Sequence, residues 1–108
     1  MKTWRVVVAD AAENDLREIF EYIAFVLLSP EIAQRQLSRI MDGIQRLGTF
    51  PERHPVFDNE MVHGLGIRRL NADNYAVFYT VSKSEKTVTI LRVIFGGRDI
   101  DTVIDQDM

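Results

Sequence analysis

Two amphipathic helical segments that nearly touch along the chain constrain the fold most strongly. The first segment, residues 11–28, carries apolar residues at helical spacing, namely Ala12, Leu16, Ile19, Phe20, Ile23 and Leu27. The second segment carries Ala33, Leu37, Ile40, Met41, Ile44 and Leu47. Only Ser29-Pro30 lies between them, a pair typical of a helix N-cap followed by a first turn. The sequence therefore predicts a helical hairpin with two apolar stripes to bury.

Capping signals flank both predicted helices. Asp10, followed by Glu13 three residues later, resembles a capping box at the start of the first helix. Ser29 is expected to cap the second helix, and Gly48 is expected to end it in a left-handed conformation. These residues fix the expected bounds of the hairpin.

Segments rich in β-branched and aromatic residues lie on both sides of the hairpin. Residues 4–9 predict a strand before it, and residues 49–66, with two prolines and two glycines, predict a connector after it. Three further strands are expected at 67–70, 75–81 and 88–95, joined by short polar turns. The predicted fold is α+β with the order β-α-α-β-β-β, a helical hairpin packed on one face of a mainly antiparallel sheet.

Length and charge limit the class of protein. At 108 residues the chain is expected to form one domain, 1–108, and its longest apolar run is too short to cross a bilayer. The absence of a secretory leader and of cysteine favours the cytoplasm. The net charge is −3, yet residues 64–98 hold six basic residues against two acidic ones, and the tail 98–108 is acidic. This segregation suits an acidic partner surface or RNA, or a solvated sheet face.

Four stretches in this order resemble the ParE/RelE superfamily of type II toxin–antitoxin toxins. They are Ala12-Glu13-Asn14-Asp15-Leu16-Arg17-Glu18-Ile19 with Tyr22-Ile23, Leu47-Gly48-Thr49-Phe50-Pro51-Glu52, Gly66-Ile67-Arg68-Arg69-Leu70 running into Asn74-Tyr75-Ala76-Val77-Phe78-Tyr79, and Ile90-Leu91-Arg92-Val93-Ile94-Phe95-Gly96-Gly97-Arg98-Asp99. The likeness covers nearly the whole chain. It implies a toxin that is neutralised by a cognate antitoxin whose C-terminal segment wraps it. ParE-like members act on DNA gyrase, whereas RelE-like and YoeB-like members cleave mRNA on the ribosome, and fold alone does not choose between these targets.

RNA cleavage by such a toxin requires a base, an acid and cations around the phosphate. Under that hypothesis the candidate catalytic residues are Arg68, Arg92, Arg98, Glu60 and Tyr79. Several nuclease relatives place a histidine or tyrosine where this chain has Phe95, which can neither donate nor accept a proton. We therefore favour a ParE-like toxin that binds gyrase. The alternatives are a ribosome-dependent mRNA endonuclease and a diverged partner of the antitoxin that has lost toxicity.

A second set of residues is expected to bind the target or the antitoxin. It consists of Arg68, Arg69, Tyr75, Tyr79, Arg92, Phe95 and Arg98. Arg92 interrupts an apolar strand, so it lies either on an open sheet face or in a salt bridge with an acid of the helices. Strand alternation places Tyr75 and Tyr79 on one face and Phe78, expected in the core, on the other; the tyrosines either meet a partner or pack under the helices.

No metal or cofactor is expected. His54 and His63 both fall in the connector, where a surface or turn role is the common one, and their spacing matches no metal motif. The expected partners are the antitoxin and either gyrase or the ribosome with its mRNA, with no membrane. An exposed sheet edge or helix groove is expected to receive an antitoxin segment that folds on binding, in a homo-oligomer or a toxin–antitoxin hetero-oligomer.

Overall fold

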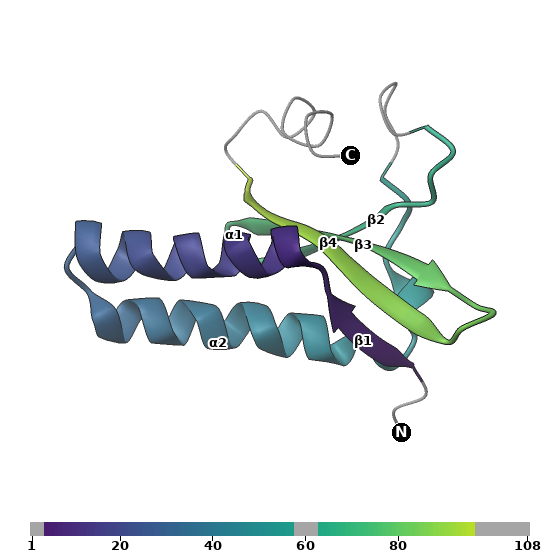
Figure 1. Cartoon of the computed structure of the whole chain (residues 1–108), viewed down its shortest axis with the longest axis horizontal. Coiled ribbons are helices and arrows are strands. Elements are labelled where there is room, and N and C mark those ends of the chain that lie inside the picture. The colour runs from purple at the N-terminus through teal and green to yellow at the C-terminus, as the bar shows by residue number, and fades with distance from the viewer. Residues whose placement is uncertain (1–3, 58–62, 97–108) are drawn as a thin grey trace.

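The computed structural model describes residues 4–57 and 63–96 and has the predicted order of elements (Figure 1). A first strand leads into two antiparallel helices, and three strands follow the connector. The elements are β1 (Arg5–Val8), α1 (Asp10–Glu21), the π-helical turn η1 (Tyr22–Val26), α2 (Pro30–Arg46), the 3-10 turn η2 (Pro51–Arg53), β2 (Arg68–Ala72), β3 (Tyr75–Ser82) and β4 (Thr87–Phe95).

The four strands form one sheet in the order β1-β4-β3-β2. The pairs β2/β3 and β3/β4 are antiparallel, because short turns join them, whereas β1 pairs with β4 in parallel. The hairpin between β1 and the later strands allows that parallel pairing. A register shift between Phe78 and Tyr79 interrupts the β3/β4 ladder. The predicted α+β architecture with a mainly antiparallel sheet is confirmed.

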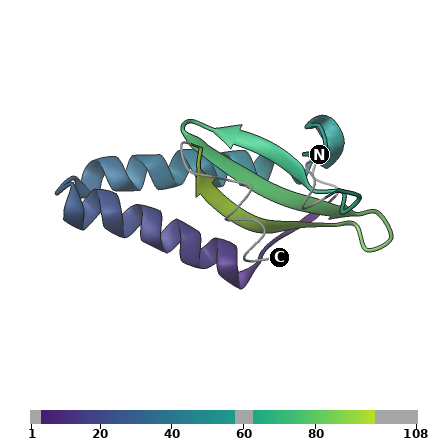
Figure 2. The same ribbon diagram turned by 90° about the horizontal axis from the view of Figure 1, so that it is seen from above.

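The helical hairpin covers one face of the sheet and extends beyond its end (Figures 1 and 2). The main core lies between these layers. It joins the helix stripes to alternate residues of the two central strands, and its buried members are Ala12, Leu16, Ile40, Ile44, Leu47, Val77, Tyr79, Val88, Ile90 and Val93. Gly43 of α2 lies so close to β2 that an added Cβ would be 3.3 Å from Cδ2 of Leu70. Burial of the two predicted stripes therefore fixes the position of the hairpin.

The opposite face of the sheet has an apolar centre of its own. Phe78, Ile67, Ala76 and Ile94 are buried there, and Phe57 of the connector packs edge-on against Phe78 with ring centroids 5.1 Å apart. The Phe57 amide donates to the Ile67 carbonyl, which fastens the connector beside β2. Phe78 is in the core, as predicted. This face is consequently covered at its centre by the chain's own packing.

The helix ends differ from the predicted caps. Ala9 holds the cap position of α1 and Asp10 is its first residue, with no side-chain cap. The Ser29 hydroxyl donates to the Leu27 carbonyl instead of capping α2, although Ser29 does occupy the cap position. Leu47, the residue that follows α2, is in a right-handed conformation, and Gly48 does not have a positive φ. The left-handed ending predicted at Gly48 is therefore wrong. Three backbone hydrogen bonds, from the amides of Leu47, Gly48 and Thr49 to the carbonyls of Ile44, Gln45 and Arg46, close the C-terminal end of α2.

The first helix also ends earlier than predicted. Its α-helical part stops at Glu21, and η1 continues it with wider π turns to Val26. Leu28 then takes a positive φ of 56°, which reverses the chain into α2. No helix among the described residues is long and apolar enough to cross a membrane.

Candidate functional site

The predicted site residues fall into two groups at different places on the sheet. Arg68 and Tyr79 face each other across β2 and β3 beside the connector, whereas Tyr75 and Phe95 face each other at the end of β3 and β4 nearer the hairpin tip. Glu60 and Arg98 lie outside the described residues. The residues predicted to bind the target or the antitoxin are therefore divided between two regions of the sheet.

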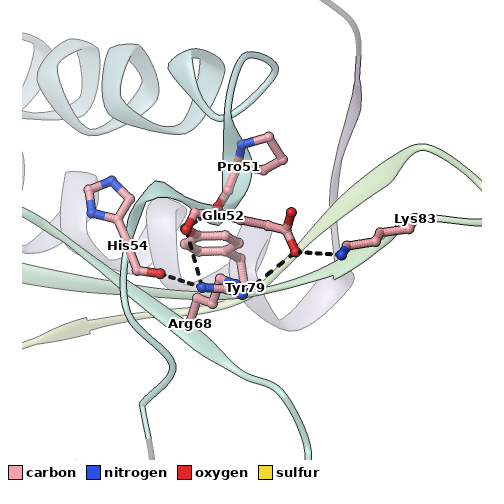
Figure 3. A network of polar contacts seen from close by, with 6 residues as sticks. All are labelled: Pro51, Glu52, His54, Arg68, Tyr79 and Lys83. Carbon is pink, nitrogen blue, oxygen red and sulfur yellow. Dashed lines mark hydrogen bonds and ion pairs between the residues drawn. The ribbon is translucent and has the colours of Figure 1, made fainter.

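The first group is the connector cluster, shown in Figure 3. Its members are Pro51, Glu52, His54, Arg68, Tyr79 and Lys83. Arg68 Nη1 donates to the His54 carbonyl at 2.6 Å and to the Glu52 carbonyl at 3.3 Å, and its Nη2 lies 3.7 Å from the Glu52 carboxylate. Only 20% of the Arg68 side chain is exposed. Arg68 thus holds the connector turn against β2, and most of its donors face the protein.

Tyr79 lies beneath this turn and is fully buried. Its hydroxyl donates to the Pro51 carbonyl at 2.6 Å, and burial raises the pKa of Tyr79 to about 12. A side chain in this position cannot meet a partner or exchange protons with RNA. The predicted catalytic and binding roles of Tyr79 are therefore wrong, and its alternative role, packing under the helices, is confirmed.

The exposed part of the connector cluster carries polar groups of three kinds. The Glu52 carboxylate lies 3.4 Å from the ammonium of Lys83, whose side chain is 75% exposed. His54 is half-buried, and burial together with the neighbouring Arg53 cation lowers the pKa of its imidazole. A neutral imidazole can accept a proton, and the ammonium can attract an anion. Glu52 and Lys83 were not among the predicted site residues, because only the folded connector brings them together.

An exposed aromatic side chain projects at the start of the connector. Phe50 takes a positive φ of 51°, which is costly for an aromatic residue, and its side chain is 77% exposed. Arg53 holds this turn by donating to the carbonyls of Phe50 and Arg46 at 3.1 Å, and to that of Thr49. The left-handed backbone therefore presents the Phe50 ring to solvent.

Arg92 lies in a buried ion pair with α1. Its Nε and Nη2 donate to the Asp15 carboxylate at 2.7 and 2.8 Å, and the Val93 amide donates to the same carboxylate at 2.9 Å. The two side chains are 12% and 9% exposed, and the hydrogen bond to Asp15 raises the pKa of Arg92. The predicted alternative, a salt bridge to an acid of the helices, is confirmed. The prediction that Arg92 lies on an open face and binds RNA is wrong. Asp15 was not among the predicted site residues. Its position on the apolar stripe of α1 is the signal that could have identified it as the partner of Arg92, a lone arginine in an apolar strand.

Arg69 remains partly exposed on β2. Its Nε donates to Asn71 Oδ1 at 3.0 Å, and its guanidinium lies 5.8 Å from the centroid of the Phe78 ring. Arg68, in contrast, is held by the carbonyls of Glu52 and His54 and by the Glu52 carboxylate. Of the two adjacent arginines on β2, Arg69 is the more available for a partner.

The second group lines a cleft between α1 and the end of β4. This α1–β4 cleft has a volume of about 450 Å³ and is lined by Asp15, Glu18, Ile19, Tyr22, Tyr75, Val93 and Phe95. Tyr75 and Phe95 pack edge to face with centroids 5.7 Å apart, and burial raises the pKa of Tyr75, with a smaller contribution from Tyr22. Phe95 is 47% exposed. Two predicted binding residues, Tyr75 and Phe95, thus meet in one cleft.

Charge is unevenly distributed between α1 and the second half of the chain. α1 contains five acidic residues and one basic residue, whereas the described basic residues of the second half lie on β2, β4, their turns and the connector. An acidic helix in the same domain as basic strands and turns suits a protein that binds macromolecules through more than one surface.

The sequence matches the model of the ParE toxin of the type II toxin–antitoxin system parDE over residues 6–100. The chain belongs to this family. No curated protein matches the sequence.

Among the solved structures with the same fold are chains from three toxin–antitoxin systems. A chain of the chromosomal ParDE system from P. aeruginosa is 21% identical with a TM-score of 0.71, covering 86% of this chain and 96% of that one. A chain of the RelBE2 complex from Mycobacterium tuberculosis is 20% identical with a TM-score of 0.66, covering 86% and 98%. A chain of the archaeal RelE–RelB complex from Pyrococcus horikoshii OT3 is 22% identical with a TM-score of 0.61, covering 89% and 98%. These likenesses show the fold.

Proposed function

We propose that this chain is a toxin that arrests growth by binding DNA gyrase in the cytoplasm and is neutralised by a cognate antitoxin. Membership of the ParE toxin family supports the toxin role. The structural neighbours come from toxin–antitoxin systems, which supports an antitoxin partner and a toxin–antitoxin hetero-oligomer. As binding residues we retain Arg69, Tyr75 and Phe95, each at least partly exposed, together with Arg98.

The observation that favours gyrase over RNA cleavage is the placement of the proton donors. Position 95 holds a phenylalanine, and the Tyr79 hydroxyl is buried against the Pro51 carbonyl. General acid catalysis requires a donor within hydrogen-bond reach of the leaving oxygen. Neither side chain can supply that proton, whereas binding to gyrase requires no proton transfer by the toxin.

The direct test is a supercoiling assay with purified gyrase and the purified chain. We expect loss of supercoiling, or accumulation of cleaved DNA, that increases with the amount of chain and is reversed by the antitoxin. The Arg69→Ala variant should weaken the effect, whereas Lys86→Ala, on the turn between β3 and β4, serves as the matched charge control. Unaltered supercoiling at a large excess of folded chain rejects the gyrase target.

The connector cluster gives a specific reason to test mRNA cleavage as the second candidate. His54 with its lowered pKa, the Glu52 carboxylate and the exposed Lys83 ammonium lie together there. Primer extension on mRNA from induced cells would detect cuts at ribosomal A sites. Cuts that disappear with His54→Ala and persist with His63→Ala would replace the gyrase proposal. If supercoiling is unaltered and no mRNA cuts are detected, the remaining alternative is a non-toxic protein that binds the antitoxin.

A further inference from the structure

The C-terminal half of β4 has one side that no described strand pairs with. The parallel pairing with β1 runs from Arg5 opposite Thr87 to Val8 opposite Ile90 and ends there, because the chain turns into α1. Beyond Ile90, β4 continues to Phe95 with β3 on its other side only. α1 lies alongside this part of β4 (Figure 2) and forms the other wall of the α1–β4 cleft.

The ladder with β3 shows which backbone groups point into the cleft. The Gly96 amide donates to Asn74 on the β3 side, whereas the Val93 amide donates to Asp15 on the α1 side. Backbone groups alternate in direction along a strand. The carbonyl of Val93 and both the amide and the carbonyl of Phe95 therefore point toward the cleft. The Asp15 carboxylate accepts from the Val93 amide, and among the described residues no hydrogen bond engages the other three groups.

The side chains of the cleft suit a cation. Arg92 forms its direct ion pair with Asp15 and reaches Glu18 only through a weaker Coulombic attraction. The Glu18 carboxylate accepts one long hydrogen bond from Asn14, at 3.4 Å. The rings of Tyr22, Tyr75 and Phe95 stand around the same space. A carboxylate beside aromatic rings is the environment that binds a lysine or arginine side chain.

Charge also identifies the kind of segment that fits. The cleft lies against α1, whose residues Asp10–Glu21 carry a net charge of −4. The chain's own residues 98–108 hold one basic and four acidic residues, so they are repelled by this helix. A basic segment of another protein is attracted to it.

We propose that an extended, basic segment of the antitoxin adds to β4 as a strand at Val93–Phe95 and places a lysine or arginine side chain in the α1–β4 cleft beside Glu18. This inference rests on the proposed antitoxin partner and gives it a location and a chemistry. Main-chain hydrogen bonds to β4 supply affinity, and the cleft supplies selectivity for the basic side chain. Phe95, which has no catalytic chemistry, becomes the apolar floor under the added strand.

The charge is tested by measuring antitoxin affinity calorimetrically for the full chain and for Glu18→Lys. We expect the dissociation constant to increase about 10- to 100-fold, because a like charge replaces the acid. Glu85→Lys makes the same charge change in the exposed turn between β3 and β4 and should leave affinity within about threefold. Equal effects of the two variants on affinity would overturn the proposal that a basic side chain of the antitoxin lies in the cleft.

The strand pairing is tested by comparing Phe95→Pro with Phe95→Ala. Both variants remove the ring, but only proline removes the amide, and that amide points away from β3, so the ladder is kept. We expect Phe95→Pro to bind antitoxin about tenfold more weakly than Phe95→Ala. Matched affinity of the two variants, both with wild-type circular dichroism, would overturn strand addition.

Amide exchange at Phe95 identifies the occupant of the edge. We expect protection only when antitoxin is bound. Protection in the free chain that increases with its concentration would show a second copy, and protection at every concentration would show the chain's own residues; either result overturns the proposal. A wild-type chain that binds no antitoxin rejects the proposed function itself, whereas tight wild-type binding that these variants leave unchanged rejects only the location.

Discussion

Replacing Asp15 with alanine removes three hydrogen bonds at once from the contact between α1 and β4. The carboxylate accepts from Nε and Nη2 of Arg92 and from the Val93 amide. In the variant, the Arg92 guanidinium, in a side chain that is 12% exposed, keeps its charge without this counter-ion. The Val93 amide also loses its acceptor at the place where β1 no longer covers the edge of β4.

The size of the effect follows from these two losses. Removing one partner of a buried ion pair costs about 3–5 kcal/mol, and an unsatisfied amide costs about 1–3 kcal/mol, with partial overlap as the side chain and water adjust. We therefore expect Asp15→Ala to lower the free energy of unfolding by about 4 kcal/mol. A domain of this size has about 5–15 kcal/mol in total, so the variant should be marginally folded at 37 °C.

Urea denaturation followed by far-ultraviolet circular dichroism measures this loss. Glu13→Ala, which removes an exposed acid of the same helix, should change the free energy of unfolding by no more than about 0.5 kcal/mol. Adding Arg92→Met to Asp15→Ala should restore at least about half of the loss, because an apolar side chain removes the stranded charge. A loss below about 1 kcal/mol in Asp15→Ala, or no recovery in the double variant, refutes the buried-pair reasoning.

Three further predictions concern stability and the site. Tyr79→Phe should lower the free energy of unfolding by about 1–2 kcal/mol, because the Pro51 carbonyl loses its donor, while growth inhibition per folded molecule stays unchanged; a large loss of toxicity at wild-type stability would restore a chemical role for the hydroxyl. The pKa of His54 is lowered in the folded protein, so folding favours the neutral imidazole. The stability that His54 contributes is therefore complete above its ordinary pKa of about 6.5 and is lost as the pH falls below that value. Denaturation midpoints of the wild type and His54→Gln should therefore diverge between about pH 7 and pH 5, and parallel curves would contradict this. Gly43→Leu should lower the melting temperature by about 5–15 °C, since an added Cβ already lies 3.3 Å from Leu70, and an unchanged melting temperature would show that α2 can move away from β2.

The periodicity of the sequence was sufficient to predict the layers of the fold. Helical spacing identified the buried stripes of α1 and α2, and alternation along β3 placed Phe78 and Tyr79 on opposite faces of the sheet. Cap positions were less predictable. Asp10 is the first residue of α1 and not its cap, and backbone hydrogen bonds in a tighter turn close α2, so Gly48 does not take the left-handed conformation.

The functional partners of individual side chains depended on contacts between distant segments. Arg92 meets Asp15 across 77 positions because β1 ends at Val8 and lets α1 reach the side of β4. Tyr79 is covered because the connector folds back and places the Pro51 carbonyl above it. Residue type indicated that each side chain needed a partner, but only the tertiary arrangement determined whether that partner lay inside the protein or outside.

Growth after induction of the chain alone, compared with growth after induction together with a cognate antitoxin, tests the central claim most directly. We expect arrest within a few generations when the chain is produced alone and normal growth when the antitoxin is produced with it. Normal growth in the absence of antitoxin, in cells shown to accumulate the folded chain, would contradict its function as a toxin.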